Sequence, residues 1–236
     1  MTTAFWFADQ PGYVKEAETS AQSFKRHNPD CEVVLFGTPQ TQPQVWSTVY
    51  SLPARRFDNW YQDSIGYFCH ALSVLSDSRL LYFDTDTYTL GRLDALIELI
   101  GRFDFIGAHA PARETAPSAL HVSEAFCELN IGVLGLHNTQ QVRAVFGMAE
   151  SLYARFSSVY GSNDQAPLRD ALWLSSNVNI YVMPPEYNCR FGFGGFAAMP
   201  VKVLHGRGLD FEDAARVVNY KPGMRAWTGR DLHERV

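Results

Sequence analysis

The chain has 236 residues, of which 46% are hydrophobic and 19% are charged. This length suits one large domain, and the composition excludes both a disordered chain and a coiled coil. The net charge of −5 argues against nucleic acid as the main partner, because duplex binding needs a positive electrostatic field.

The first half of the chain alternates between short apolar runs and stretches with helical periodicity. Uninterrupted apolar runs predict strands, and apolar residues spaced three and four apart predict helices. The predicted strands are 4–8, 32–36 and 79–83, and the predicted helices are 11–27 and Tyr61 to Leu75. Because strands that alternate with helices pair in parallel, this order predicts a parallel sheet.

The second half continues the alternation less regularly. The spacing of Ser162 and Gln165 is typical of a capping box and predicts the start of a helix. The other predicted elements are a helix at 93–100, a strand at 103–108, a loop at 110–121, a strand at 129–136, a helix from Val142 to Phe156, a strand at 178–183 and a last strand at 201–204. We expect one α/β domain over 1–236, with a Rossmann-like sheet flanked by helices and a tail at 209–236 whose packing the pattern does not define.

Two carboxylates follow the apolar strand at 79–83. A parallel sheet binds ligands at the carboxyl ends of its strands, and Asp84 and Asp86 come at such an end. Residues two apart in extended chain project to the same side, so both side chains can contact one hard cation. The alternative is that these residues only cap the turn after the strand, as Asp commonly does.

The order of the elements and several local motifs resemble the family 8 glycosyltransferases, a group that includes glycogenin and bacterial galactosyl- and glucosyltransferases. The resemblance extends roughly from Ala4 to Gly208. The matching motifs are Ala8-Asp9-Gln10-Pro11-Gly12-Tyr13, Asp84-Thr85-Asp86-Thr87, Asn130-Ile131-Gly132-Val133, Asn163-Asp164-Gln165, Glu186-Tyr187-Asn188 and Val203-Leu204-His205-Gly206-Arg207-Gly208. The resemblance implies a Rossmann-like GT-A fold.

The resemblance also implies roles for individual residues. The residues expected to contact the nucleotide-sugar donor are Ala8, Asp9, Tyr13, Asp84, Thr85, Asn130, Gly132, His205 and Gly208. The expected ligands of Mn²⁺ or Mg²⁺ are Asp84, Asp86 and His205, and the expected catalytic residues are Asp164 and Gln165. The implied reaction moves a hexose from a UDP-sugar to an acceptor hydroxyl, with a metal ion on the diphosphate and with retention of configuration.

The basic residues of the chain depart from the family pattern. Family members usually carry a basic residue on the helix before the Asp-x-Asp motif, but 61–77 contains no Lys or Arg and only His70 can replace it. The usual Lys after the last motif is also missing. Arg207 and Lys221 therefore remain as candidates to contact the phosphates.

Each motif also has an interpretation that needs no ligand. Asp164 and Gln165 can cap a helix, and His205 can be a satisfied buried histidine. A catalytically inactive nucleotide-sugar-binding protein of the same fold therefore remains open. A haloacid-dehalogenase-type phosphohydrolase fits less well, because that family usually begins near its Asp-x-Asp strand and carries Thr or Val where this chain has Tyr88.

No apolar run is long enough to span a membrane, and the first ten residues lack the pattern of a signal peptide. The four cysteines are scattered, as reduced thiols usually are. We therefore expect a cytoplasmic protein whose partners are a nucleotide-sugar donor and a glycan, lipid-linked or protein acceptor. The basic stretch from Arg216 to Val236 can add weak peripheral membrane contact.

Overall fold

A seven-stranded sheet with the strand order β3-β2-β1-β4-β7-β6-β8 forms the centre of the protein. The computed structural model describes residues 1–37, 45–57, 59–110, 117–126 and 128–228. The strands of this sheet are β1 (Thr2–Ala8), β2 (Glu32–Gly37), β3 (Thr48–Tyr50), β4 (Arg79–Phe83), β6 (Phe105–His109), β7 (Leu129–His137) and β8 (Ile180–Val182). Strand β7 runs antiparallel to β4 and β6, and the other neighbouring strands pair in parallel. The predicted α/β fold with a mostly parallel sheet is confirmed, with β7 as the exception.

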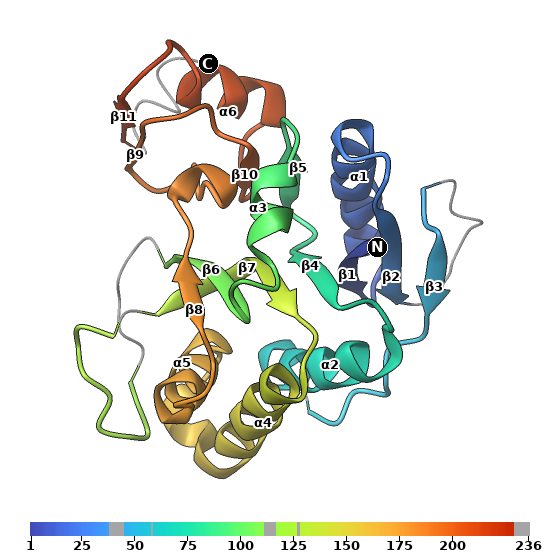
Figure 1. The fold of residues 1–236 in the computed structure, drawn as a ribbon, viewed down its shortest axis with the longest axis vertical. Coiled ribbons are helices and arrows are strands. Elements are labelled where there is room, and N and C mark those ends of the chain that lie inside the picture. The colour runs from blue at the N-terminus through green and yellow to red at the C-terminus, as the bar shows by residue number, and fades with distance from the viewer. Residues whose placement is uncertain (38–44, 58, 111–116, 127, 229–236) are drawn as a thin grey trace.

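Helices cover both faces of this sheet (Figure 1). Helices α1 (Pro11–His27) and α3 (Asp94–Leu99) pack on one face, and α2 (Trp60–Val74), α4 (Gln140–Tyr160) and α5 (Gln165–Leu174) pack on the other. In β1, Phe5 and Phe7 belong to the cluster under α2 and α4, whereas Trp6 belongs to the cluster under α1. Because β1 is buried on both faces, its sequence from Ala4 to Ala8 is a continuous apolar run and does not alternate with polar residues.

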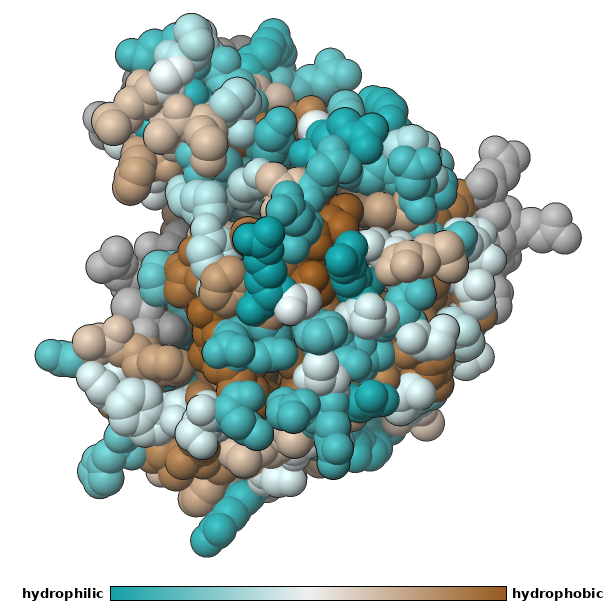
Figure 2. Space-filling model, viewed as in Figure 1, coloured by the Kyte–Doolittle hydropathy of each residue, from teal (hydrophilic) through white to brown (hydrophobic). Residues whose placement is uncertain are grey.

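A smaller lobe lies at the upper left of Figure 1, and a notch separates part of it from the main body in Figure 2. Its elements are β5 (Thr87–Thr89), η1 (Pro185–Tyr187), β9 (Gly195–Ala197), β10 (Val203–His205), α6 (Phe211–Val218) and β11 (Arg225–Trp227). Antiparallel pairs join β5 to β10 and β9 to β11. Since β5 follows β4 after a short turn, its pairing with β10 brings the lobe to the carboxyl end of a central strand.

The described part of the expected tail, 209–228, packs into this lobe. Trp227 is buried in the lobe's apolar cluster, and α6 contributes Val217 to the same cluster. The guanidinium of Arg225 is also buried, and its Nε donates to the carbonyl of Val218 at 2.7 Å. Arg225 is therefore not available to lipid headgroups. Within the described ranges, no helix is long and apolar enough to cross a bilayer.

Several predicted elements need correction. Strand 201–204 corresponds to β10, but it is not the last strand, because β11 follows it. The predicted capping box between Ser162 and Gln165 is wrong, because α5 already begins at Gln165. Asn163 caps the helix instead, since its side chain accepts from the backbone N–H of Ala166 at 2.9 Å. In the predicted loop, 117–121 form no helix or strand, and 111–116 lie outside the described residues.

Candidate functional site

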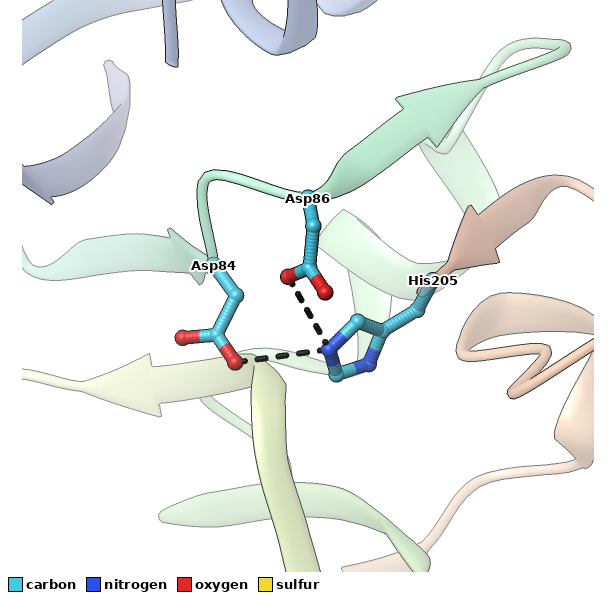
Figure 3. A group of neighbouring side chains, drawn as sticks. All are labelled: Asp84, Asp86 and His205. Atoms are coloured by element: carbon cyan, nitrogen blue, oxygen red, sulfur yellow. Dashed lines mark ion pairs between the residues drawn. The ribbon is translucent and has the colours of Figure 1, made fainter. Parts of the chain in front are cut away.

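Asp84 and Asp86 lie on the turn that connects β4 to β5. The chain is not extended here, so the reason given above for their convergence, alternation along an extended strand, is wrong. Backbone hydrogen bonds fix the turn at both ends. The N–H of Asp84 donates to the carbonyl of Gly132 at 2.8 Å, and the N–H of Gly206 donates to the carbonyl of Asp86 at 2.9 Å. Both carboxylates nevertheless point toward one place (Figure 3).

His205, at the end of β10, completes the group (Figure 3). Its Nε2 atom lies 3.4 Å from Asp84 Oδ2 and 3.4 Å from Asp86 Oδ1. One ligand atom from each of the three residues lies within 4.8 Å of the other two. The three residues expected from the sequence to hold a metal are thus brought together, although His205 lies more than a hundred positions beyond the two aspartates along the chain.

Hydrogen bonds fix the orientation of the His205 ring. Nδ1 lies 2.8 Å from Asn188 Oδ1, and Asn188 Nδ2 donates to Asn130 Oδ1 at 2.9 Å. Because the amide of Asn188 presents its oxygen to the ring, Nδ1 carries the hydrogen and Nε2 faces the carboxylates. A histidine that ligates a metal usually donates its other ring N–H in this way.

Gly132 on β7 provides the space for the ring. A Cβ atom at this position would lie 1.9 Å from His205 Cε1. No side chain larger than hydrogen fits there unless the ring moves. The glycine of the predicted motif therefore lies behind the candidate metal ligand and does not itself line the cavity of the site.

The charges of the group favour a bound cation. Burial alone would raise the pKa of Asp86, but His205 and Arg207 outweigh it and lower the pKa to about 2. Burial likewise opposes protonation of His205, and the two carboxylates more than compensate and raise its pKa. Two carboxylate oxygens and one imidazole nitrogen suit a divalent cation of the Mn²⁺ type, since carboxylates prefer hard ions and imidazole prefers softer ones. The residues present therefore fit a metal ion.

A cavity of about 890 Å³ lies over this group, within the size range of small-molecule sites. Its lining includes these residues expected from the sequence: Ala8, Asp9, Tyr13, Asp84, Thr85, Asp86, Asn130, Asp164, Gln165 and His205. Gly208 does not line it, and neither do His70 and Lys221, two of the basic candidates. The third candidate, Arg207, does line it, with its guanidinium 5.5 Å from the ring centre of Tyr13.

Asp164 and Gln165, at the start of α5, also line the cavity. Asp164 makes no capping hydrogen bond to the described backbone of its helix, and its Oδ2 accepts from Ser64 at 2.8 Å. Burial is the main cause that raises the pKa of Asp164, to about 7, and Asp84 adds to the effect. The alternative that Asp164 serves only as a helix cap is therefore wrong.

Gln165 is held by three partners. Its Oε1 accepts from Asn130 Nδ2 at 2.9 Å and from the backbone N–H of Ile131 at 3.3 Å, and its Nε2 donates to Glu128 at 2.9 Å. Glu128 is buried beside Arg169. The side chain amide of Gln165 is thus fixed in position before any ligand binds.

Sequence reasoning missed several residues of the cavity, above all Arg55 and Arg190. Arg55 precedes α2, so a search for basic residues within that helix passes over it. Arg190 follows two positions after Asn188, and only its proximity to the matched turn offered a signal. Ser64 and Glu128, which contact Asp164 and Gln165, carried no motif at all.

Comparisons with known proteins identify the fold. No protein-family model and no curated protein sequence matches the chain. The structure of apo-form glycosyltransferase GlyE from Streptococcus pneumoniae is similar with a TM-score of 0.63 and 17% identity, over 99% of this chain and 59% of GlyE. That of galactosyltransferase LgtC, solved with donor and acceptor sugar analogues, has a TM-score of 0.62 and 14% identity, over 100% of this chain and 95% of LgtC. The chain thus spans somewhat more than half of GlyE, and it shares the fold of these glycosyltransferases.

Replacement of Gly132 tests the packing behind His205. We expect Gly132→Ala to displace the ring, to weaken Mn²⁺ binding at least about tenfold and to destabilise the fold by about 1–3 kcal/mol. Mn²⁺ titration calorimetry and thermal melts measure the two effects. Gly147→Ala in α4 is the control, because its Cβ meets nothing within 4 Å; we expect unchanged Mn²⁺ affinity there. Equal affinities of both variants would contradict this role of Gly132.

The buried carboxyl of Asp164 predicts a dependence of stability on pH. Its folded-state pKa of about 7 lies above the ordinary value, so its contribution is fully present below about pH 4 and is lost as pH rises through 7. Asp164→Asn removes this loss. We expect the free energy of unfolding of the variant to exceed that of the parent protein by about 4 kcal/mol at pH 8, and by only about 1–2 kcal/mol at pH 5, in denaturant titrations with EDTA. A difference that does not change between these pH values would refute the assignment.

Proposed function

We propose that this chain is a metal-dependent glycosyltransferase of the GT-A type, similar to family 8, that moves a hexose from a UDP-sugar to an acceptor hydroxyl. The observation that carries the proposal is the convergence of Asp84, Asp86 and His205 under a cavity of about 890 Å³. The similarity in fold to known glycosyltransferases supports the same assignment.

The geometry suggests how the residues of the chain divide the work. Asp84, Asp86 and His205 would hold the cation, and a cation bound there would neutralise charge on the departing diphosphate. Tyr82 and Asn188 keep two of these ligands in place, since the Tyr82 hydroxyl donates to Asp84 at 2.7 Å and Asn188 fixes the His205 ring. The result is a set of ligands that needs little rearrangement.

Asp164 and Gln165 form the wall that would face the sugar. In a transfer with retention, the bond from the sugar to the diphosphate breaks, and the acceptor oxygen bonds to the sugar on the same face. The acceptor proton passes to the departing phosphate oxygen, so the wall supplies no base. Gln165 is fixed by Asn130 and Glu128, and it can stabilise the positive charge of the sugar through its amide dipole.

The main alternative is a protein of the same fold that binds a nucleotide-sugar without turnover. Its support in the sequence was the lack of basic residues at the family positions. Arg55, Arg190 and Arg207 line the cavity from other positions, which weakens that argument. The proposal includes a cytoplasmic location and a glycan, lipid-linked or protein acceptor, as the sequence led us to expect.

Nucleotide release provides the test. With Mn²⁺ and UDP-glucose, UDP-galactose or a UDP-N-acetylhexosamine, we expect the protein to release UDP and EDTA to abolish the release. Asp86→Asn should lower the rate at least about a hundredfold, because it removes a charged metal ligand. The matched control is Asp94→Asn, an exposed residue paired with Arg92. Equal turnover by Asp86→Asn and the parent protein would contradict the mechanism. UDP binding without turnover of any donor would favour a protein of the same fold that binds a nucleotide-sugar without turnover.

A further inference from the structure

The three arginines that line the cavity differ in how their guanidinium groups are engaged. Arg55 lies 3.7 Å from Asp63. Arg207 donates to both carboxylate oxygens of Glu16, at 2.8 and 2.6 Å, and lies 3.3 Å from Asp86. For Arg190, no carboxylate of the described residues lies within ion-pair distance, although Asp84 and Asp86 are close by.

The contact of Arg190 is with His205 instead. Its terminal nitrogen NH1 lies 2.8 Å from Nε2 of the imidazole. A guanidinium only donates hydrogen bonds, so Nε2 accepts and its lone pair is engaged. The hydrogen on Nδ1, which Asn188 requires, agrees with this assignment. Arg190 therefore holds the same lone pair that a metal ion on His205 needs.

These two uses of Nε2 exclude each other. A neutral imidazole has one acceptor nitrogen, and it cannot bind a metal ion while it accepts from Arg190. Repulsion between the metal ion and the guanidinium adds to the conflict. Binding of the ion by all three ligands thus requires Arg190 to move away from His205.

The structure also indicates where Arg190 can go. Its Nε atom is buried without a hydrogen-bond partner among the described residues, so the group is under-satisfied as it stands. The guanidinium lies 5.3 Å from the ring centre of Phe193. This cation–π contact can be kept while the guanidinium moves away from His205. A diphosphate on the metal would lie next to the group, and the planar fork of Arg matches phosphate oxygens.

We propose that Arg190 is a displaceable cation, which engages His205 Nε2 when no metal is bound and moves to the donor diphosphate when metal and nucleotide bind. This inference rests on the proposed function for its second half. It has a thermodynamic consequence: Arg190 opposes the metal alone and favours the nucleotide with the metal, so it couples the two binding events.

Calorimetry with Mn²⁺ and UDP as probes tests this coupling through Arg190→Gln, whose shorter side chain carries no charge. We expect Mn²⁺ alone to bind the variant about fivefold more tightly than it binds the parent protein, because the competing donor is gone. We expect UDP, with Mn²⁺ saturating, to bind at least about tenfold more weakly, because a charge-assisted hydrogen bond is lost. Changes of opposite direction in the Mn²⁺ and UDP affinities distinguish this coupling from a general loss of binding.

Two further variants complete the design. Arg102→Gln, an exposed residue paired with Glu98, is the control and should change neither affinity. Arg190→Lys keeps the charge without the fork, so Mn²⁺ binding should stay near that of the parent protein while UDP binding weakens. This variant also tests the inference if Arg190→Gln does not fold, as thermal melts will show.

The outcomes separate this inference from the proposed function. If the parent protein binds Mn²⁺ but no UDP, the proposed function fails, and tighter Mn²⁺ binding by Arg190→Gln still supports competition at His205. Unchanged affinities in Arg190→Gln overturn the inference and leave the proposed function intact. Weaker binding of both probes at an unchanged melting temperature also overturns it, since Arg190 would then support His205. If neither the parent protein nor Arg190→Gln binds Mn²⁺, the result overturns both the inference on Arg190 and the proposed function.

Discussion

The pairing of β5 with β10 is the constraint on which the candidate site depends. It sets His205 opposite Thr87, one residue after Asp86, and so joins the lobe to the carboxyl end of β4. The contact is close enough that β7 must carry a glycine behind the ring. If β10 slipped by one residue along β5, every side chain would change faces and His205 would turn away from the carboxylates. The positions of the three metal ligands relative to one another therefore depend on the register of this short pair of strands.

Charge explains why the site is so densely bonded. Two carboxylates at the base of a cavity repel each other unless cations lie among them, and this cost grows as water is excluded. Arg207, 3.3 Å from Asp86, and Arg190, in contact with the His205 ring, supply positive charge beside Asp84 and Asp86. Glu16 in turn holds Arg207 through two hydrogen bonds. These two arginines thus offset part of the repulsion between the two carboxylates before any cation binds.

Much of the fold could be predicted from the sequence, because its longer elements carry strong patterns. The limits of α1 and β4 agree with the predicted ranges, since a proline begins the helix and an apolar run defines the strand. The short strands β5, β9 and β11 carry no such signal, because three residues are too few to show alternation. The antiparallel direction of β7 was missed as well, since its apolar run has the same pattern in either direction.

The residues of the candidate site also divide into those with a local sequence signal and those without one. Asp84 and His205 could be found because each belongs to a motif at the end of a strand, Asp84 directly after β4 and His205 as the last residue of β10, and strand ends are where a sheet gathers ligands. Arg190 and Glu128 could not, because their importance comes from contacts across the fold: one with the imidazole of His205, the other with the amide of Gln165. A search for a basic residue at a fixed distance from a motif fails when another segment supplies the same charge to the same point. The position of the charge in space is what an anionic ligand recognises, and the chain has more than one route by which to bring an arginine there.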